Sequence, residues 1–185
     1  MKLNKIAVAV ALMLGASTGI QAANAAPAIV KAGDQGHGKI TFTGSIIDSP
    51  CSIDPNSVDQ TIQLGAVSSV ALVDGGTSAP KPFEIRLEKC SLDTAKTVKT
   101  TFNGPTGQGD LLGITGDASG AGIALTDGDG ALIKLGTAST GQLVSVGASN
   151  ATLAFSAHLK GNGGGADSII PGEFSSVATF MLSYN

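Results

Sequence analysis

The sequence is poor in aromatic, cysteine and charged residues. It has no tryptophan, one tyrosine and two cysteines, and charged residues make up 14% of it. Its basic residues form no patch and are not interleaved with aromatic ones, which argues against nucleic-acid binding. No apolar run reaches the roughly 18 residues of a membrane-spanning helix, and no G-x-S-x-G motif offers a hydrolase nucleophile. The composition therefore favours none of these three classes.

The N-terminus has the layout of a secretory signal peptide. Lys2 and Lys5 precede an apolar run over residues 6–15, and small residues lead to Ala25. A charged region, a short apolar region and an A-x-A site in this order are typical of such peptides. We expect residues 1–25 to be removed after Ala25, with Ala22 as the second choice. Removal of the two lysines leaves 9 of the 11 basic residues and all 14 acidic residues, so the mature formal charge is −5.

The two cysteines, Cys51 and Cys90, have two possible uses. In an exported chain they most simply form one disulfide. Closing a loop of about 40 residues would destabilise the unfolded chain by roughly 4 kcal/mol. A metal site that adds His37 and His158 is the alternative, but the sequence has no C-x-x-C or H-x-x-x-H spacing. We therefore expect the disulfide and no metal.

Short alternating runs of apolar and polar residues predict an all-β fold. Alternation with period two marks strands that bury one face, and clusters of Gly, Pro, Asn and Asp between the runs mark turns. Many short strands of this kind indicate a β-sandwich or barrel. No sustained helical period follows the signal peptide. The expected strands cover residues 83–88, 98–102, 123–125, 133–135, 152–160 and 174–184.

Two polar motifs have a structural interpretation. Residues 127–130 read D-G-D-G, which fits either a hairpin turn or a fragment of a calcium loop. The remaining ligand positions and the terminal Glu of such a loop are missing, so we expect the turn. His158 shares a strand face with Lys160, and we expect it to be a solvated strand residue.

A further alternating run lies shortly after the expected cleavage site. Ile40, Phe42, Gly44 and Ile46 would lie on one face of an extended strand, with polar residues on the other. A glycine in the middle of the apolar face leaves a packing hole and costs backbone entropy. It makes sense if another backbone must approach that face closely. The run therefore looks like a strand that a partner receives.

The C-terminal strand is the second unusual feature. The strongest strand pattern, over residues 174–184, stops one residue before the sequence does. A final strand deep in a sandwich usually has a further edge strand beside it. We therefore expect an extra half-buried strand at one end of the chain and a missing neighbour at the other.

These two ends resemble the subunits of chaperone–usher fimbriae, in particular the major subunit of P-type and type 1-like fimbriae. The resemblance covers essentially the whole mature chain. Each motif alone is modest, but the joint arrangement is specific. The matching features are the G-x-I-x-F-x-G-x-I-x-D-x-P-C run of residues 38–51, the second cysteine Cys90, Gly172 and Tyr184.

The resemblance implies an incomplete immunoglobulin-like β-sandwich that lacks its last strand. Residues 46–185 would form the pilin domain and residues 26–45 an N-terminal donor-strand extension. In this family the extension of one subunit fills the gap in the next, after a periplasmic chaperone has occupied it. The implied donor residues are Gly38, Ile40, Phe42, Gly44 and Ile46, and the implied groove strand contains Gly172, Ala178, Phe180, Leu182 and Tyr184.

The expected function is that of a structural, non-enzymatic rod subunit of a cell-surface fimbria, without cofactor. Its partners would be identical or related pilin subunits, the periplasmic chaperone and an outer-membrane usher. A minor adaptor or terminator subunit is the near alternative. A monomeric secreted β-sandwich that binds a ligand, with residues 38–46 folded back in cis, is a second. A hydrolase is a third, without a visible nucleophile.

Overall fold

The computed structural model describes residues 36–93 and 96–185. The expected signal peptide and residues 26–35 of the expected extension lie outside this range. The chain divides into two units, residues 1–45 and 46–185. In the first unit, residues 36–45 are exposed and carry no helix or strand. The described residues include no helix that is long and apolar enough to cross a membrane.

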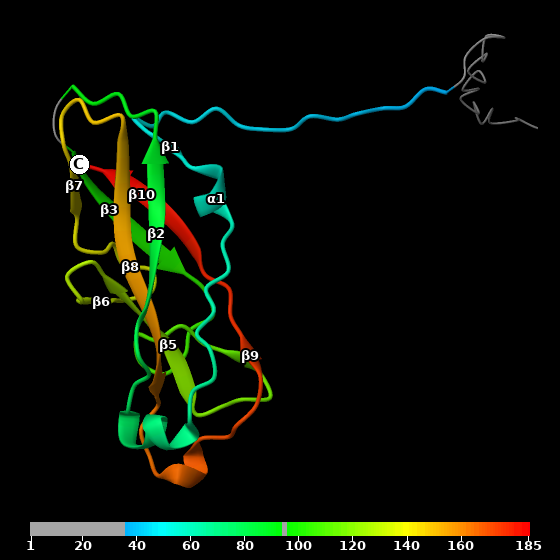
Figure 1. The fold of residues 1–185 in the computed structure, drawn as a ribbon, viewed down its shortest axis with the longest axis vertical. Coiled ribbons are helices and arrows are strands. Elements are labelled where there is room, and N and C mark those ends of the chain that lie inside the picture. Colours follow the sequence, from blue (N-terminus) through cyan, green and yellow to red (C-terminus); the bar gives the residue numbers. More distant parts are fainter. Residues whose placement is uncertain (1–35, 94–95) are drawn as a thin grey trace, which may run out of the picture. The chain divides into compact units, whose positions relative to one another are not determined.

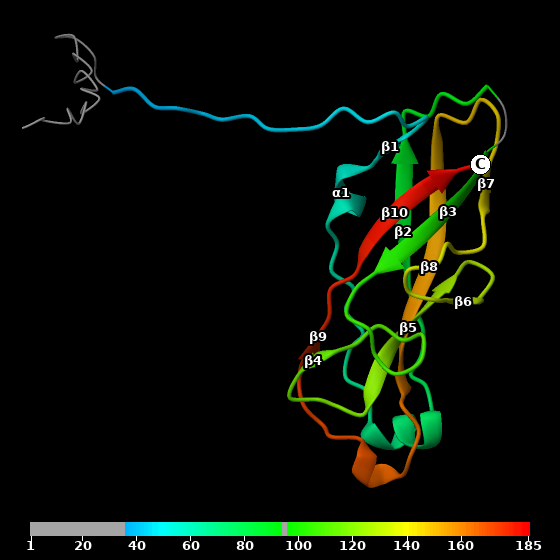
Figure 2. The same cartoon turned by 180° about the vertical axis from the view of Figure 1, so that it is seen from behind.

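The regular secondary structure of the second unit is mainly β-strand, which confirms the all-β prediction (Figures 1 and 2). Every strand pairing that the described residues form is antiparallel. One sheet has the order β1 (Ser52–Ile53), β2 (Lys81–Glu88), β8 (Asn150–Gly161), β5 (Ala121–Asp127) and β6 (Leu132–Ile133). A second has the order β10 (Thr179–Tyr184), β3 (Lys96–Asn103) and β7 (Gln142–Val144), and β4 (Thr115–Gly116) pairs with β9 (Phe174–Ser175).

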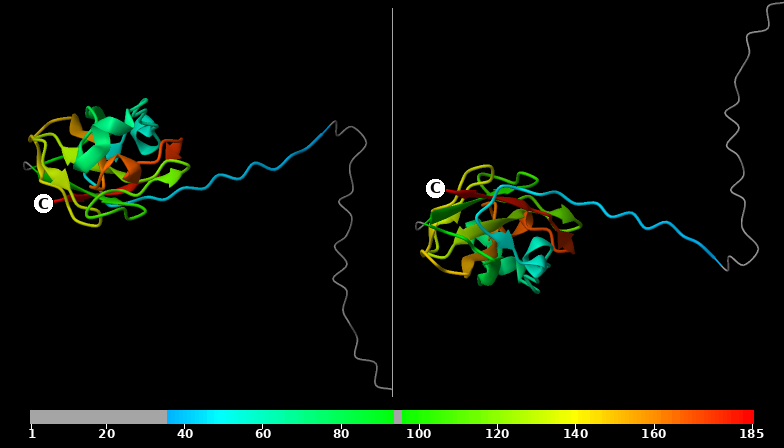
Figure 3. Two further views of the ribbon diagram at one scale, coloured as in Figure 1. Left: turned by 90° about the horizontal axis from the view of Figure 1, so that it is seen from below. Right: turned by 90° about the horizontal axis from the view of Figure 1, so that it is seen from above.

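The two larger sheets pack face to face around one core. Figures 1 and 2 show β3 and β10 running obliquely across β2 and β8, and Figure 3 shows the strands end-on around a common interior. Four aromatic rings join the layers. Phe83 and Phe155 of the first sheet stack at 5.5 Å, and Phe102 of the second meets Phe155 edge to face at 5.3 Å. Phe180 lies 6.4 Å from Phe102.

Among the described residues, three short helices interrupt the strands. They are α1 (Pro55–Val58), the 3-10 helix η1 (Ser69–Gly75) and the 3-10 helix η2 (Ala166–Ser168). The side chain of Asp54 caps α1 by accepting the backbone N–H of Asn56 at 2.8 Å. None of them is long enough to be stable by itself in water. They connect or flank the sheets.

The C-terminal segment differs from the single strand that the sequence predicts. It forms β9 and β10, with an unpaired stretch at residues 176–178 between them. The Ser176 hydroxyl donates to the carbonyl of Gly113 at 2.6 Å, which pulls this stretch away from a straight ladder. Gly172 lies before β9 and Ala178 before β10, so the prediction that both belong to one continuous strand is wrong.

The polar turn at residues 127–130 is the hairpin between β5 and β6, as predicted. The Asp127 carboxylate accepts the backbone N–H groups of Asp129 at 3.1 Å and Ala131 at 2.9 Å. Gly130 has φ of 83°, a left-handed conformation that glycine adopts without strain. The carboxylate therefore holds a tight turn.

The prediction that His158 is a solvated residue is wrong. It is half-buried, opposite the fully buried Ala124 of β5. Burial lowers the pKa of His158 below its ordinary value of 6.5, and the charge of Lys160 lowers it further. Both effects favour the neutral imidazole.

Candidate functional site: an open strand edge

β10 lies at the edge of its sheet and is paired on one side only. Phe180 pairs with Phe102, and Tyr184 with Val98, on β3. Within residues 36–93 and 96–185, no strand and no backbone hydrogen bond meets the other side of β10. Such an edge presents a row of N–H and C=O groups that can pair with another chain. β10 is therefore a template for an additional strand.

The inner face of β10 is apolar and only half covered. Phe180, Leu182 and Tyr184 are half-buried and pack against the core, while the alternate residues are exposed. Met181, on the outer face, is 62% exposed. An added strand with apolar side chains at every second position would complete the burial of this face.

A hollow of about 260 Å³ lies beside β9. Its walls come from several segments far apart in the sequence, among them residues 65–67 and residues 171–172. Gly172 lines it, and a Cβ there would lie 2.7 Å from the backbone nitrogen of Ala118. Glycine is thus required for a close backbone approach at the rim. The main apolar side chains of the hollow are Val67, Leu72, Ile114, Leu159, Ile169 and Phe174.

The segment before η1 supplies groove residues that the sequence analysis missed. Residues 59–68 form no strand, yet Leu64 and Val67 pack against the core. Alternation of Ile62 and Leu64 with polar neighbours was the signal that could have revealed them. We use the name C-terminal groove for Leu64 and Val67, the hollow beside β9 and the inner face of β10.

The implied donor residues have no such packing in the single chain. Ile40 is 78% and Phe42 89% exposed. A Cβ built at Gly38 or Gly44 would meet no atom within 4 Å in the described structure. Residues 36–49 are not part of any strand. The donor role therefore stays a prediction, and Gly44 has no local reason to be glycine.

Cys51 and Cys90 form the predicted disulfide, with their Cα atoms 4.1 Å apart. The bridge joins the residue before β1 to the turn that follows β2. Ser91 also donates its backbone N–H to the Pro50 carbonyl at 2.8 Å. The disulfide excludes the alternative of a metal site that uses both thiolates. It fixes the point where residues 36–50 join the sandwich.

Comparison with known proteins agrees with this architecture. The family model of the fimbrial protein matches residues 40–185. The chain is 53% identical over 186 residues to the Fimbria A protein of Serratia marcescens, covering 100% of this chain and 99% of the relative. It is 45% identical over 187 residues to the major MR/P fimbria protein of Proteus mirabilis, with the same coverage.

Solved structures show the same fold. The P pilus rod subunit PapA superposes with a TM-score of 0.62 at 30% identity, over 74% of this chain and 100% of that one. A subunit of a chaperone–usher pilus superposes with a TM-score of 0.63 at 31% identity, over 86% and 100%. The immunoglobulin-like sandwich predicted from the sequence is confirmed. The chain belongs to the fimbrial protein family, as a structural subunit of a chaperone–usher fimbria on the cell surface.

Proposed function

We propose that this chain is the repeating rod subunit of its fimbria, and that residues 38–46 of one copy add as a strand to β10 of the next. The observation that carries the proposal is the open edge of β10 above a half-covered apolar face. The chain also contains an exposed segment with apolar residues at every second position. The same chain thus offers a donor and an acceptor, as a linear polymer requires.

The energetics favour such an addition. Burying the side chains of Ile40, Phe42 and Ile46 would contribute on the order of 5–9 kcal/mol before entropy costs. Backbone hydrogen bonds along β10 would fix the register, and the side chains would select the segment. A rod subunit is supported further by the PapA likeness and by the major fimbrial relative from Proteus mirabilis.

The open edge also implies a protecting partner before assembly. An unpaired edge beside exposed apolar side chains is prone to aggregation. We infer that a periplasmic chaperone pairs with β10 first, and that an outer-membrane usher exchanges it for the donor segment. The role is structural and non-enzymatic. An adaptor subunit would use the same edge, but the rod-subunit likeness favours the repeating role.

A charge in the donor segment tests the proposal. In the full chain expressed with its chaperone and usher, Phe42→Asp should abolish the ladder of detergent-resistant multimers while leaving the subunit–chaperone complex. Thr43→Asp, on the opposite face, is the matched control and should assemble. Normal ladders from Phe42→Asp would contradict strand donation by this segment. Loss of ladders from both variants would show an effect of charge rather than of the apolar face.

A further inference from the structure

β2 is a second strand with an incompletely paired edge. Its neighbour on that side, β1, pairs only with Leu87 and Glu88. Six residues of β2, from 81 to 86, have no strand beside them there in the described structure. Pro82 cannot donate a backbone hydrogen bond, which already weakens this edge as a template. The backbone of Glu84 and Arg86 could still receive a strand.

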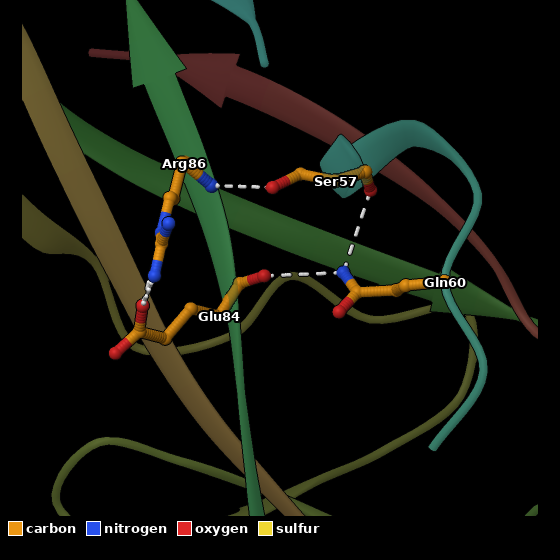
Figure 4. A network of polar contacts seen from close by, with 4 residues as sticks. All are labelled: Ser57, Gln60, Glu84 and Arg86. Carbon is orange, nitrogen blue, oxygen red and sulfur yellow. Dashed lines mark hydrogen bonds and ion pairs between the residues drawn. The ribbon is translucent and has the colours of Figure 1, made fainter. Parts of the chain in front are cut away.

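Side chains close this stretch instead of a strand, as Figure 4 shows. The backbone N–H of Arg86 donates to the hydroxyl of Ser57 at 3.0 Å. The side-chain amide of Gln60 donates to the carbonyl of Glu84 at 3.1 Å and more weakly to that of Ser57 at 3.4 Å. The Arg86 carbonyl accepts the backbone N–H of Asp54 at 2.9 Å. We call Ser57 and Gln60 the β2 plug.

A hollow lies beside the contacts between the plug and β2. Its volume is about 390 Å³, and Ile62 and Phe83 form part of its lining. Val58 of α1 is 63% exposed, whereas Ser57 is 4% exposed. Phe83 is half-buried at the wall of this hollow. The β2 edge thus combines backbone groups and an apolar wall, the two features that make β10 an acceptor, and polar side-chain contacts keep it closed.

We propose that Ser57 and Gln60 restrict each subunit to one acceptor edge by preventing strand addition at β2. The strand they exclude is the exposed segment of residues 38–46 from a second copy. This inference rests on the proposed function, since it takes that segment as the donor. With one donor and one acceptor, subunits form a linear chain. With a second acceptor, they form branches.

Photo-crosslinking tests the plug in the full chain, co-expressed with its chaperone and usher. Phe42 is replaced by benzoylphenylalanine, and cross-linked peptides are mapped by mass spectrometry. In otherwise unchanged protein, cross-links should fall on β10 and the C-terminal groove. In Ser57→Ala/Gln60→Ala, cross-links to residues 81–86 should rise on the order of tenfold, because the hydrogen bonds that compete with a strand are lost. Electron micrographs should show branch points.

Gln63→Ala is the matched control. Gln63 lies on the same segment, is exposed, and makes no side-chain hydrogen bond among the described residues. It should give the unchanged pattern. Gln60→Ala alone keeps the buried Ser57 and should show a smaller rise, which guards against misfolding of the double variant. An intact disulfide on non-reducing mass spectrometry verifies folding in each case.

The outcomes separate this inference from the proposed function. Cross-links at β10 in every variant, with no increase at β2 in either plug variant, overturn the plug and leave the proposed function standing. Absence of cross-links at β10 in the unchanged chain overturns strand donation, and the plug inference with it. An equal rise at β2 in Gln63→Ala also overturns the plug, because the effect would not depend on the hydrogen bonds to Glu84 and Arg86.

Discussion

The edges of β2 and β10 differ in how their backbone groups are used. Both strands place a half-buried phenylalanine, Phe83 or Phe180, against the same aromatic cluster. On β2, the backbone groups that point away from β8 are hydrogen-bonded. The Arg86 N–H and the Glu84 carbonyl bond to side chains, and the Arg86 carbonyl bonds to the backbone N–H of a loop residue. On β10, the outward groups have no partner within the described part of the chain. Of these two edges, that of β10 is the one left available for pairing in the described part of the chain.

Other edges are closed in the same way as that of β2. Next to β7, Ser139 bonds the backbone of Thr100 on β3. The N–H of Thr100 donates to the Ser139 hydroxyl at 3.0 Å, and the Thr100 carbonyl accepts the backbone N–H of Ser139 at 2.9 Å. On β8, the Gln142 side chain bonds both the N–H and the carbonyl of Ala154. Polar side chains and loop backbone N–H groups therefore satisfy individual backbone groups where a strand would otherwise add. The backbone N–H and C=O groups that stay without a partner at the edge of β10 therefore mark the candidate assembly site.

The largest expected effect comes from a charge inside the open edge. Leu182→Asp should abolish both the chaperone complex and the multimer ladder, because a carboxylate would enter the apolar C-terminal groove without a partner. Co-purification with the chaperone and gel ladders measure the two losses. Met181→Asp changes the exposed outer face of the same strand and should retain both. Equal behaviour of the two variants would contradict an inner-face groove.

The second-largest effect should come from removing the disulfide, which would weaken the closed edge of β2. Cys51 anchors the chain immediately before β1, which is the only strand beside β2 on that side in the described residues. In the entropy model, opening a loop of about 40 residues costs about 4 kcal/mol of unfolding free energy. Urea titration of Cys51→Ser/Cys90→Ser against the oxidised chain measures it. A loss of unfolding free energy much smaller than about 4 kcal/mol would mean that β1 stays in place without the bridge.

A bulky residue at Gly44 sharpens the comparison from the donor side. No atom lies within 4 Å of a Cβ at Gly44 in the single chain, so Gly44→Leu should leave subunit stability unchanged. In a tight acceptor, the extra volume should weaken insertion by roughly 1–3 kcal/mol. Competition between peptides of residues 36–48 with and without the change, for a chaperone-bound subunit, measures the loss.

Ser45→Leu in the same peptide is the control, because position 45 lies on the polar face. It should displace the chaperone as well as the unchanged peptide does. Equal displacement by the Gly44→Leu peptide would mean that the donor site has room at that position. The glycine in the apolar run would then need another explanation.

The sequence predicts the local features of this fold well. Alternation identifies β2, β3 and β8 because each buries one face more deeply than the other. It also locates β5, although this strand is buried on both faces. Redox context and the count of two predict the disulfide. The D-G-D-G run predicts the β5–β6 hairpin, whose geometry depends on neighbouring residues only. These features are encoded within a few residues or by composition.

Features that depend on distant contacts are not visible in the same patterns. The break at residues 176–178 depends on the Gly113 carbonyl, which is 63 residues from Ser176 in sequence. The plug depends on Gln60 meeting Glu84, 24 residues away. No periodicity or spacing in the sequence shows that a glutamine on an extended segment will bond to the edge of a distant strand. Ile62 and Leu64 showed an alternation too short to stand out.

The smallest expected effect comes from opening the edge of β8. Gln142→Ala removes the hydrogen bonds of 2.9 Å and 3.1 Å to the backbone N–H and carbonyl of one residue, Ala154. The two groups are exposed and can bond water, so unfolding free energy should fall by about 1–2 kcal/mol. Multimer ladders and cross-links should not change, because one residue's backbone is too short a template for a strand. Gln108→Ala, at an exposed loop position, is the control for denaturant titration. New cross-links near Ala154 in Gln142→Ala would mean that even a single freed residue admits the donor segment, and that edge closure must extend over the whole sandwich.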